Sequence, residues 1–501
     1  MRKIINRTDC FKKRAYFLKL LCCSMLLCLS CSEEEIPIDN PDGLEVHDII
    51  IVGGGISGLT CGYYLGNKDF VILEKNSKVG GRAISGTYNN ITYAKGAEYL
   101  GEPEDHLAEM IKGLGVSLKE IPEPMDAYFD GSKFYYGSDA INGYLIKNSS
   151  LSTFNRFVSF LLSNYDQYDD IPDLDYNGWA SSLDHISAQQ WLLNNNFPEV
   201  YSEKYDVASR GLFGASLNEI SALSFIPEAA FDYDETDLEY TDYDVKTDAA
   251  TRQEEHSESF TFLKGLTELT DKLGERMNSK IKLNCDVINI TYEGGAYHVN
   301  YKNKDGSANT MLARKIVLAV PAPIALNIAS EVISSEKAEI MKDVEYSSYA
   351  TVALFSDVPI FDKAFDLAVP DGYFFTDIYD ATWVQKHYDK SITPDTYIAS
   401  VYIAPATYKD HTLDGMSDTE LLQKVYADLN KVFAGASSKV TGYDITHFPY
   451  AYPVMTLGAY DRLIRLDGMN KGSMVLAGDY LIYPTFESAV ESGYLAAKRV
   501  K

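Results

Sequence analysis

The sequence predicts an α/β fold in which a domain with a doubly wound parallel sheet is joined to a second domain. Three observations predict it. Residues 47–52 form an apolar run rich in β-branched residues, as in a strand buried on both faces. A glycine-rich turn, a helical stretch at 59–65 and a second apolar run at 70–73 follow in order. The 501 residues also exceed what a single hydrophobic core normally holds.

The turn after the first strand reads Gly53-Gly54-Gly55-Ile56-Ser57-Gly58, a GxGxxG pattern between a strand and a helix. The first glycine of such a turn permits a tight bend, the second lets the backbone approach a pyrophosphate, and the third lets helix and strand pack closely. Glu74 ends the second strand 21 positions after Gly53, where a carboxylate binds a ribose 2′-hydroxyl and repels a 2′-phosphate. The sequence therefore predicts a Rossmann-type domain that binds an adenine dinucleotide other than NADP. The residues expected to bind it are Gly53, Gly55, Ile56, Ser57, Gly58 and Glu74.

A second signature follows directly, as Glu74-Lys75-Asn76-Ser77-Lys78-Val79-Gly80-Gly81-Arg82. It resembles the second FAD signature of the flavin-dependent amine oxidase superfamily, which includes monoamine oxidases, protoporphyrinogen oxidases and phytoene desaturases. The resemblance implies FAD as the cofactor, with Lys75 and Gly81 beside it. It also implies that Arg82 binds the pyrophosphate, as suits a planar cation.

Two further stretches resemble parts of this superfamily that face the cofactor. Residues 91–99 are similar to a loop that passes the flavin ring, and residues 286–290 are similar to a strand whose backbone meets the adenine. The additional contacts that this resemblance implies are Gly96, Ala97, Glu98, Tyr99 and Val287.

The C-terminal segment resembles the last flavin motif of the superfamily, a strand and an acidic residue followed by a helix. The N-terminus of that helix is expected to point at the flavin, where the helix dipole stabilises negative charge. No cysteine lies near the segment, which predicts that FAD is bound non-covalently. The contacts implied here are Gly478, Asp479, Phe486, Glu487 and Ala489.

The resemblance covers nearly all of the chain after its first 45 residues and implies two discontinuous domains. We expect a Rossmann-type FAD-binding domain and an α+β substrate-binding domain, with the active site between them. The segments expected for the FAD-binding domain are 46–103, 258–321 and 456–501. Those expected for the substrate domain are 104–257, which is largely helical, and 322–455.

The implied reaction is hydride transfer from a carbon of a small organic substrate to the flavin. Thr351 lies near the position at which amine-oxidising members carry a lysine beside the flavin, and it is the catalytic candidate. Thr485 stands where monoamine oxidases place a cage tyrosine. Because a threonine offers no positive charge to nascent superoxide, oxygen is expected to be a poor electron acceptor compared with a quinone.

Three functional hypotheses remain from the sequence. An amine or amino-acid oxidase fits the family and the acidic composition. A dehydrogenase or desaturase of an apolar substrate is supported by residues 448–453 and 484–489, which are similar to the carotenoid and squalene desaturase branch. The third hypothesis is a flavoprotein that binds a partner without catalysis.

Residues 1–30 read as a secretory signal, with a basic leader and an apolar segment too short to span a bilayer. The segment ends at Cys31 and resembles a lipoprotein signal, which implies that Cys31 carries acyl chains and anchors the protein in a bacterial outer membrane. The acidic residues 32–35 are similar to the export tag of surface lipoproteins, so display at the cell surface is the alternative to facing the periplasm. Residues 31–45 are then a tether.

The composition and local patterns disfavour two kinds of binding, to nucleic acid and to a metal ion. The net charge of −27 disfavours binding to nucleic acid, which is itself anionic. The acidic run at 232–244 is interpreted as a solvated segment because it lacks the glycine and terminal glutamate of a calcium loop, and no metal site is predicted. His185 is interpreted as a surface residue near a helix start.

Overall fold

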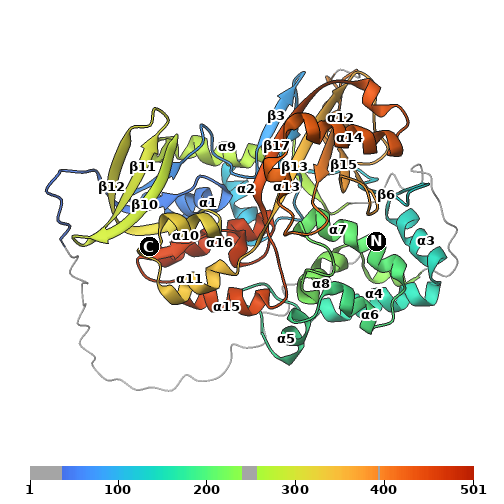
Figure 1. The fold of residues 1–501 in the computed structure, drawn as a ribbon, viewed down its shortest axis with the longest axis horizontal. Coiled ribbons are helices and arrows are strands. Elements are labelled where there is room, and N and C mark those ends of the chain that lie inside the picture. The colour runs from blue at the N-terminus through green and yellow to red at the C-terminus, as the bar shows by residue number, and fades with distance from the viewer. Residues whose placement is uncertain (1–36, 240–256, 393–394) are drawn as a thin grey trace. The chain divides into compact units, whose positions relative to one another are not determined.

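A computed structural model describes residues 37–239, 257–392 and 395–501 of the chain. The signal segment, Cys31 and residues 240–244 of the acidic run at 232–244 lie outside the described residues. Two seven-stranded sheets dominate the part from residue 39 onward, and Figure 1 shows their strands as two separate groups.

The first sheet has the order β10-β11-β12-β1-β2-β9, with β18 pairing with β12. Its central pairs β12–β1–β2–β9 and β12–β18 are parallel, whereas β10, β11 and β12 form an antiparallel extension. The predicted strands at 47–52 and 70–73 are confirmed as adjacent parallel strands. The strands are β1 (Val46–Val52), β2 (Phe70–Glu74), β9 (Ile281–Leu283), β10 (Cys285–Glu293), β11 (Ala296–Asn303), β12 (Ala308–Leu318) and β18 (Met474–Leu476).

Helices cover both faces of this sheet, as a doubly wound fold requires. Alternate residues of β1 divide between two cores, with Ile50 and Val52 facing one and Ile49 and Ile51 facing the other. One core includes helices α1, α2, α9 and α16, and the other includes α10, α11 and α15. These helices are α1 (Ile56–Leu65), α2 (Asp105–Leu114), α9 (Thr267–Arg276), α10 (Ala322–Ile328), α11 (Ser335–Lys342), α15 (Ala459–Met469) and α16 (Phe486–Val500).

The second sheet has the order β17-β13-β16-β15-β14-β6-β7 and is antiparallel except for the pair β14–β6. One face packs against helix α14 (Asp418–Val432) in an apolar core. Its strands are β6 (Asp126–Phe129), β7 (Phe134–Tyr136), β13 (Tyr346–Ser356), β14 (Asp366–Ala368), β15 (Asp377–Asp380), β16 (Tyr397–Ile403) and β17 (Val440–Pro453).

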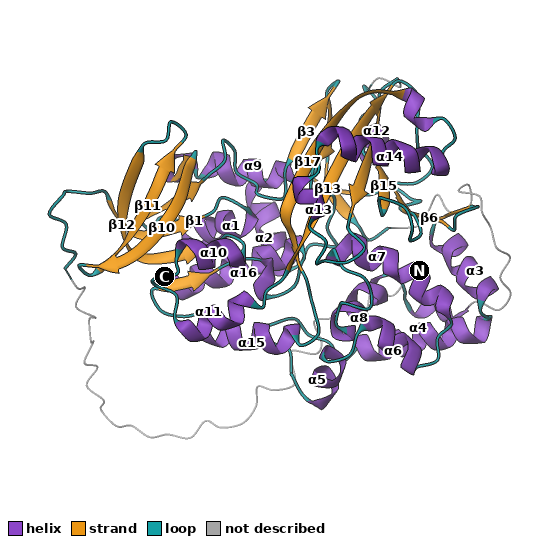
Figure 2. Ribbon diagram, viewed as in Figure 1, coloured by secondary structure: helices purple, strands orange, loops and turns teal. Residues whose placement is uncertain are grey.

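A group of helices lies between residues 138 and 231, as the helical periodicity of this segment predicts (Figure 2). They are α3 (Ser138–Asn148), α4 (Leu151–Tyr165), α5 (Gly178–Asp184), α6 (Ala188–Asn194), α7 (Glu199–Phe213) and α8 (Ala222–Phe231). The small elements are β3 (Ser85–Tyr88), β4 (Ile91–Ala94), β5 (Leu118–Glu120), β8 (Phe260–Phe262), α12 (Trp383–Tyr388) and α13 (Thr412–Gly415).

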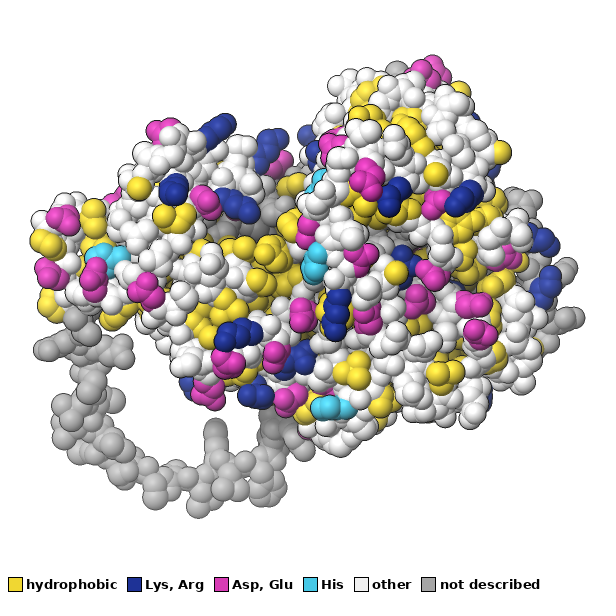
Figure 3. Space-filling view, in the orientation of Figure 1, with side chains coloured by type: hydrophobic (Ala, Val, Ile, Leu, Met, Phe, Trp, Pro, Cys, Tyr) yellow, Lys and Arg dark blue, Asp and Glu magenta, His cyan; other side chains and the backbone are white. Residues whose placement is uncertain are grey.

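The exact domain limits stay a prediction. Helices α2, α10 and α11 fall in segments expected for the substrate domain, yet they pack in the cores of the first sheet. Over the described part of the chain, the helices are all too short or too polar to cross a bilayer. The face drawn in Figure 3 mixes acidic and basic side chains without a large area of one sign.

Candidate active site

The glycines of the first turn differ in what surrounds them. A Cβ added to Gly53 would lie 2.3 Å from the Ala319 oxygen, and one added to Gly58 would lie 2.1 Å from the Gly53 oxygen. A Cβ on Gly55 would meet no atom nearer than the Gly81 Cα at 3.9 Å. Gly53 and Gly58 are therefore needed for packing, whereas the space over Gly55 is left open by the fold itself.

Glu74 is held in place by backbone amides. Its Oε2 accepts from the Gly54 amide at 2.7 Å and its Oε1 from the Asn76 amide at 2.8 Å. The side chain is buried at the end of β2, where a ribose contact is predicted. Lys75, by contrast, is exposed.

The second signature folds back onto the first. The Gly80 amide donates to the Gly54 carbonyl at 2.9 Å, and Gly81 has a positive φ of 61° beside Gly55. Gly54 and Gly55 thus lie against Gly80 and Gly81, and together they form a stretch of backbone without side chains that we call the cradle. Helix α1 opens onto it with no capping side chain and no acidic residue in its first turn, so its free amides suit an anion.

Arg82 and Asp479, which are 397 positions apart, meet beside this cradle. The Arg82 Nη2 donates to Asp479 Oδ1 at 2.8 Å, and the Arg82 Nη1 also donates to the Ala451 carbonyl. Asp479 is buried, so its charge is paired where water has little access. The structure therefore brings together the two ends of the chain that resemble flavin motifs.

The helix after Asp479 begins with its own cap. Thr485 is the N-cap of α16 and accepts from the Ser488 amide at 3.2 Å, so this side chain organises the helix start. Glu487 accepts from the Gly101 amide at 3.0 Å. Phe486 and Ala489 are buried in the core that α16 shares with α1, where Gly493 allows close contact with the Ser57 carbonyl.

The loop predicted to face the flavin rests on Arg82 and on the second sheet. The Ala97 amide donates to the Arg82 carbonyl at 3.1 Å, and a Cβ on Gly96 would lie 2.0 Å from that oxygen. Glu98 and Tyr99 are partly exposed. Val287, the predicted adenine contact, lies buried on β10, at the edge of the first sheet.

Thr351 lies on β13 below this loop. Its hydroxyl donates to the Lys95 carbonyl at 2.8 Å, and the side chain is buried. Thr351 thus positions the residue that precedes Gly96. Its catalytic role stays a prediction.

Tyr402 contacts the same loop from β16. Its hydroxyl lies 2.7 Å from the Gly96 carbonyl oxygen and 2.9 Å from Glu98 Oε1. A phenol carries one hydrogen, and a carbonyl oxygen can only accept. The Tyr402 hydroxyl therefore donates to the Gly96 carbonyl, and a protonated Glu98 donates to the Tyr402 oxygen. Burial raises the pKa of the Glu98 carboxyl to about 7, which agrees with this arrangement.

The second sheet carries a set of polar side chains of which only Thr351 is expected from the sequence. Thr351, Tyr402 and Asp377 are paired in register across β13, β16 and β15. The neighbouring row runs across β16, β15, β14 and β6 and consists of Ser400, Tyr379, Asp366 and Asp126. Because directly paired residues share a face, these seven side chains lie together on the face opposite α14. We call them the polar face.

The aspartates of the polar face hold protons unusually tightly. Burial raises the pKa of Asp126 to about 7 and that of Asp377 to about 7. Burial and then the neighbouring Asp377 raise the pKa of Asp366. Strand periodicity gives little signal for these acids, because the strands that carry Asp366 and Asp377 have only three and four residues.

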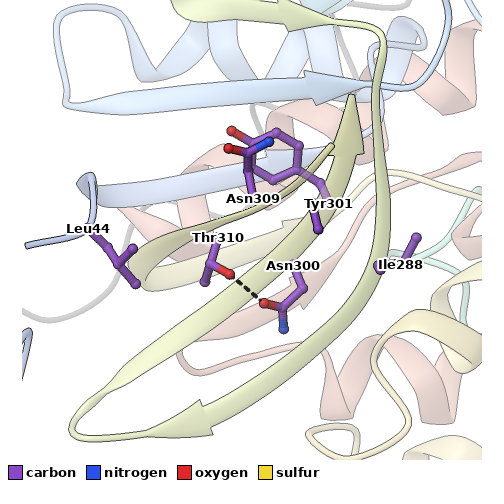
Figure 4. A pocket seen from close by; sticks show the side chains of 7 residues that line it. Leu44, Ile288, Asn300, Tyr301, Asn309 and Thr310 are labelled. Carbon is purple, nitrogen blue, oxygen red and sulfur yellow. Dashed lines mark hydrogen bonds between the residues drawn. The ribbon is translucent and has the colours of Figure 1, made fainter. Parts of the chain in front are cut away.

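His185 is exposed at the end of α5, and its ring lies 2.8 Å from the Ser181 carbonyl, in agreement with a surface position. Within the described ranges, no three acidic, histidine or cysteine side chains are arranged to hold a metal ion. A pocket of about 540 Å³ lies on the hairpins of the first sheet, where Thr310 donates to Asn300 (Figure 4). Its lining has no carboxylate, histidine or cysteine.

The chain matches the family model for flavin containing amine oxidoreductases over residues 56–501. It belongs to this family. A chloroplastic protoporphyrinogen oxidase of Arabidopsis thaliana is 21% identical over 61% of this chain and 58% of its own length. A probable flavin-containing monoamine oxidase A of Dictyostelium discoideum is 23% identical over 73% of this chain and 76% of its own.

A putrescine oxidase double mutant of known structure has the same fold, with a TM-score of 0.68 at 16% identity over 91% of this chain and 99% of its own. The chain thus combines an α/β fold with membership of the flavin containing amine oxidoreductase family. The open space at Gly55, the uncapped amides of α1 and the Arg82–Asp479 pair fit the flavin cofactor that the family implies.

Proposed function

We propose that this oxidoreductase binds one FAD non-covalently and removes a hydride from a small organic substrate at the polar face. The contact between Arg82 and Asp479 carries the proposal, because it joins two distant flavin-type motifs beside the glycine turn in which the space over Gly55 is open. FAD, when bound, supplies the hydride acceptor.

The residues of the chain would divide the binding of FAD between them. The α1 amides and Arg82 would hold the pyrophosphate, and Glu74 would accept from the adenosine ribose. Asp479 would accept hydrogen bonds from hydroxyl groups of the flavin side chain. The N-terminus of α16 would stabilise negative charge on the flavin ring.

The proposal is tested by Gly55→Val. The new side chain enters space that the protein leaves open, so the fold should survive while the approach of the pyrophosphate is blocked. We expect a folded protein that has lost nearly all of its FAD, measured by flavin absorbance per chain after gel filtration and by circular dichroism.

Gly468→Val is the matched control, because a Cβ at that position meets no atom within 4 Å and Gly468 lies near the end of α15. It should keep one FAD per chain. Full FAD occupancy in Gly55→Val would contradict the proposal. Acid precipitation of the wild-type protein should leave FAD in the supernatant, since no covalent bond retains it.

Two substrate classes compete at this site. The names of the similar proteins include amine oxidases, and the acids of the polar face suit an amine. An apolar isoprenoid is the second candidate, supported by the desaturase-like residues 448–453 and 484–489. For the electron acceptor we favour a quinone over oxygen, because Thr351 supplies a hydroxyl already bonded to Lys95 rather than a charge.

We also propose that the protein is exported and anchored in a membrane through acylated Cys31. The basic leader followed by a short apolar segment supports this proposal. Cys31→Ala should move the protein from the membrane pellet to the soluble fraction. Unchanged pelleting of that variant would contradict acylation as the anchor.

A further inference from the structure

The loop predicted to face the flavin, at residues 95–98, is held through its carbonyl groups. Two of the side chains that donate to these carbonyls are threonines, Thr351 at 2.8 Å and Thr261 at 3.0 Å. The third donor is the Tyr402 hydroxyl, which lies 2.7 Å from the Gly96 carbonyl oxygen. A threonine hydroxyl does not titrate, whereas the Tyr402 hydroxyl also contacts a carboxyl group. The middle of the loop therefore depends on a donor whose hydrogen bond can change with pH.

Tyr402 has one hydrogen to give and two oxygens within reach. While Glu98 is protonated, Glu98 donates to the Tyr402 oxygen and Tyr402 donates to the Gly96 carbonyl. An ionised Glu98 has no hydrogen to donate, and its carboxylate is a stronger acceptor than a carbonyl. The hydrogen of Tyr402 then turns to Glu98, and the Gly96 carbonyl loses its donor.

The position of Gly96 matters to the proposed cofactor site. A Cβ at Gly96 would lie 2.0 Å from the Arg82 carbonyl oxygen, and the next amide, that of Ala97, donates to this same oxygen at 3.1 Å. The Arg82 side chain is bonded to Asp479. A shift of the Gly96 peptide therefore acts on the backbone of the residue proposed to bind the pyrophosphate.

Several other titratable groups face this pair from the second sheet. They are Tyr349, Tyr379, Tyr452, Asp366 and Asp377. Burial raises the pKa of the three tyrosines, so they stay neutral near pH 7. Neither aspartate bonds to the Tyr402 hydroxyl, whose contacts among the described residues are Gly96 and Glu98. Lys95 of the loop itself is paired with Asp444 at 2.7 Å, so Glu98 is the acid through which pH acts directly on Tyr402.

We propose that Glu98 is a positioning residue of the flavin-facing loop, which fixes the Gly96 carbonyl through Tyr402 while it holds a proton and frees that carbonyl when the proton leaves. Glu98 is partly exposed, so the proton exchanges with water. Burial raises the pKa of Glu98 to about 7, which places the change near neutral pH. The inference rests on the proposed function in one respect, that the loop faces bound FAD.

The test follows FAD-loaded, full-length mature protein from about pH 5 to about pH 9. The dissociation constant of FAD is measured by flavin fluorescence, and hydrogen exchange of the peptide at residues 93–100 is measured by mass spectrometry. In the wild type, FAD should bind several-fold more weakly at high pH, because one hydrogen bond that holds the loop is lost. The change should follow the loss of one proton, with a midpoint near pH 7.

Glu98→Gln separates positioning from a merely structural role. A side-chain amide donates to Tyr402 as a protonated carboxyl does, but it does not titrate. This variant should therefore bind FAD at every pH as the wild type does at pH 5, and at pH 9 its loop should exchange several-fold more slowly than that of the wild type. Comparison at the same pH removes the intrinsic pH dependence of amide exchange.

Two further variants complete the test. Tyr402→Phe removes the donor to Gly96, so it should bind FAD several-fold more weakly than the wild type at pH 5 and show no transition with pH. Glu102→Gln, which changes an exposed acid just after the loop, is the matched control for charge and should keep the wild-type transition.

Two outcomes would overturn the inference. A transition that persists unchanged in Glu98→Gln would assign it to another acid, and a wild type that behaves like Glu98→Gln at every pH would show that Glu98 positions nothing. Both comparisons stand even if Tyr402→Phe does not fold. Hydrogen exchange is read from the chain itself, so a transition in a protein that holds no FAD would reject the proposed function alone, whereas one FAD per chain without a transition would reject only this inference.

Discussion

The two sheets of the molecule place functional residues in different ways. In the first sheet these residues lie where strands end, in short continuous stretches such as 53–58, 80–82 and 478–479. In the second sheet they lie within strands, on alternate positions of β13, β16, β15, β14 and β6. The first arrangement uses bare backbone, and the second uses side chains.

This difference suggests that the first sheet serves cofactor binding and the second sheet serves substrate specificity. We propose that the glycine turns bind a group common to many flavoproteins, and their geometry is fixed by backbone packing such as that of Gly58 against the Gly53 carbonyl. A sheet face can change its side chains without altering its hydrogen-bonded ladder. We therefore expect cofactor variants to fail completely and polar-face variants to retain the fold and change specificity or pH response.

The largest expected effect lies at the first sheet, in Asp479→Ala. It removes a cofactor contact and leaves Arg82 without its carboxylate, so FAD affinity should fall at least about tenfold, given the usual cost of losing a charged hydrogen bond. Flavin fluorescence during dialysis measures the loss.

Asp467→Ala is the comparison for this variant, because Asp467 also pairs with an arginine, Arg499 in the last turn of α16. That end of the helix lies on the order of 20 Å from the end expected to face the flavin. Retention of FAD by Asp479→Ala, or its equal loss in Asp467→Ala, would break the distinction between the two regions.

An intermediate effect is expected in the pH dependence of stability. Glu98, Asp126 and Asp377 have pKa values raised to about 7, so between about pH 4 and 7 the folded state holds protons that the unfolded state has lost. The stability that these groups contribute is therefore present at low pH and lost as the pH rises through 7.

Thermal unfolding at pH 5 and pH 8 measures this effect. The Thr376 hydroxyl and the Arg210 guanidinium lie near Asp377, and both oppose the rise in the pKa of this carboxyl. We expect a melting temperature several degrees lower at pH 8 and a smaller difference in Asp377→Asn. A melting temperature that rises between pH 5 and pH 8 would show that the polar face is neutralised within the fold.

The smallest effect is expected for Thr351→Lys. A lysine there would place a positive charge below the loop at Gly96, so the reduced flavin should react with oxygen several-fold faster. Thr351→Ser, which keeps the hydroxyl for the Lys95 carbonyl, should leave the rate unchanged. Stopped-flow mixing of dithionite-reduced protein with aerated buffer gives both rates, and wild-type reoxidation as fast as in a true oxidase would contradict a quinone acceptor.

The sequence predicts the strands at 47–52 and 70–73 closely, because they are continuous apolar runs, and it predicts the turns beside them, because these have fixed glycine spacings. Asp366 and Asp377 could not be predicted as neighbours from the sequence. Each lies on a strand of three or four residues, too short for a period to register, and the two become neighbours only through strand pairing.

Anaerobic reduction of the bound flavin distinguishes the two substrate classes proposed for the polar face. Flavin-loaded protein is mixed without oxygen with spermidine, butylamine or squalene, and the absorbance of the oxidised flavin is followed. Because the acids of the polar face suit an amine, we expect an amine to bleach the flavin and squalene to leave it oxidised. Bleaching by squalene alone, or an unchanged spectrum with both amines despite one FAD per chain, would show that the polar face does not bind an amine substrate.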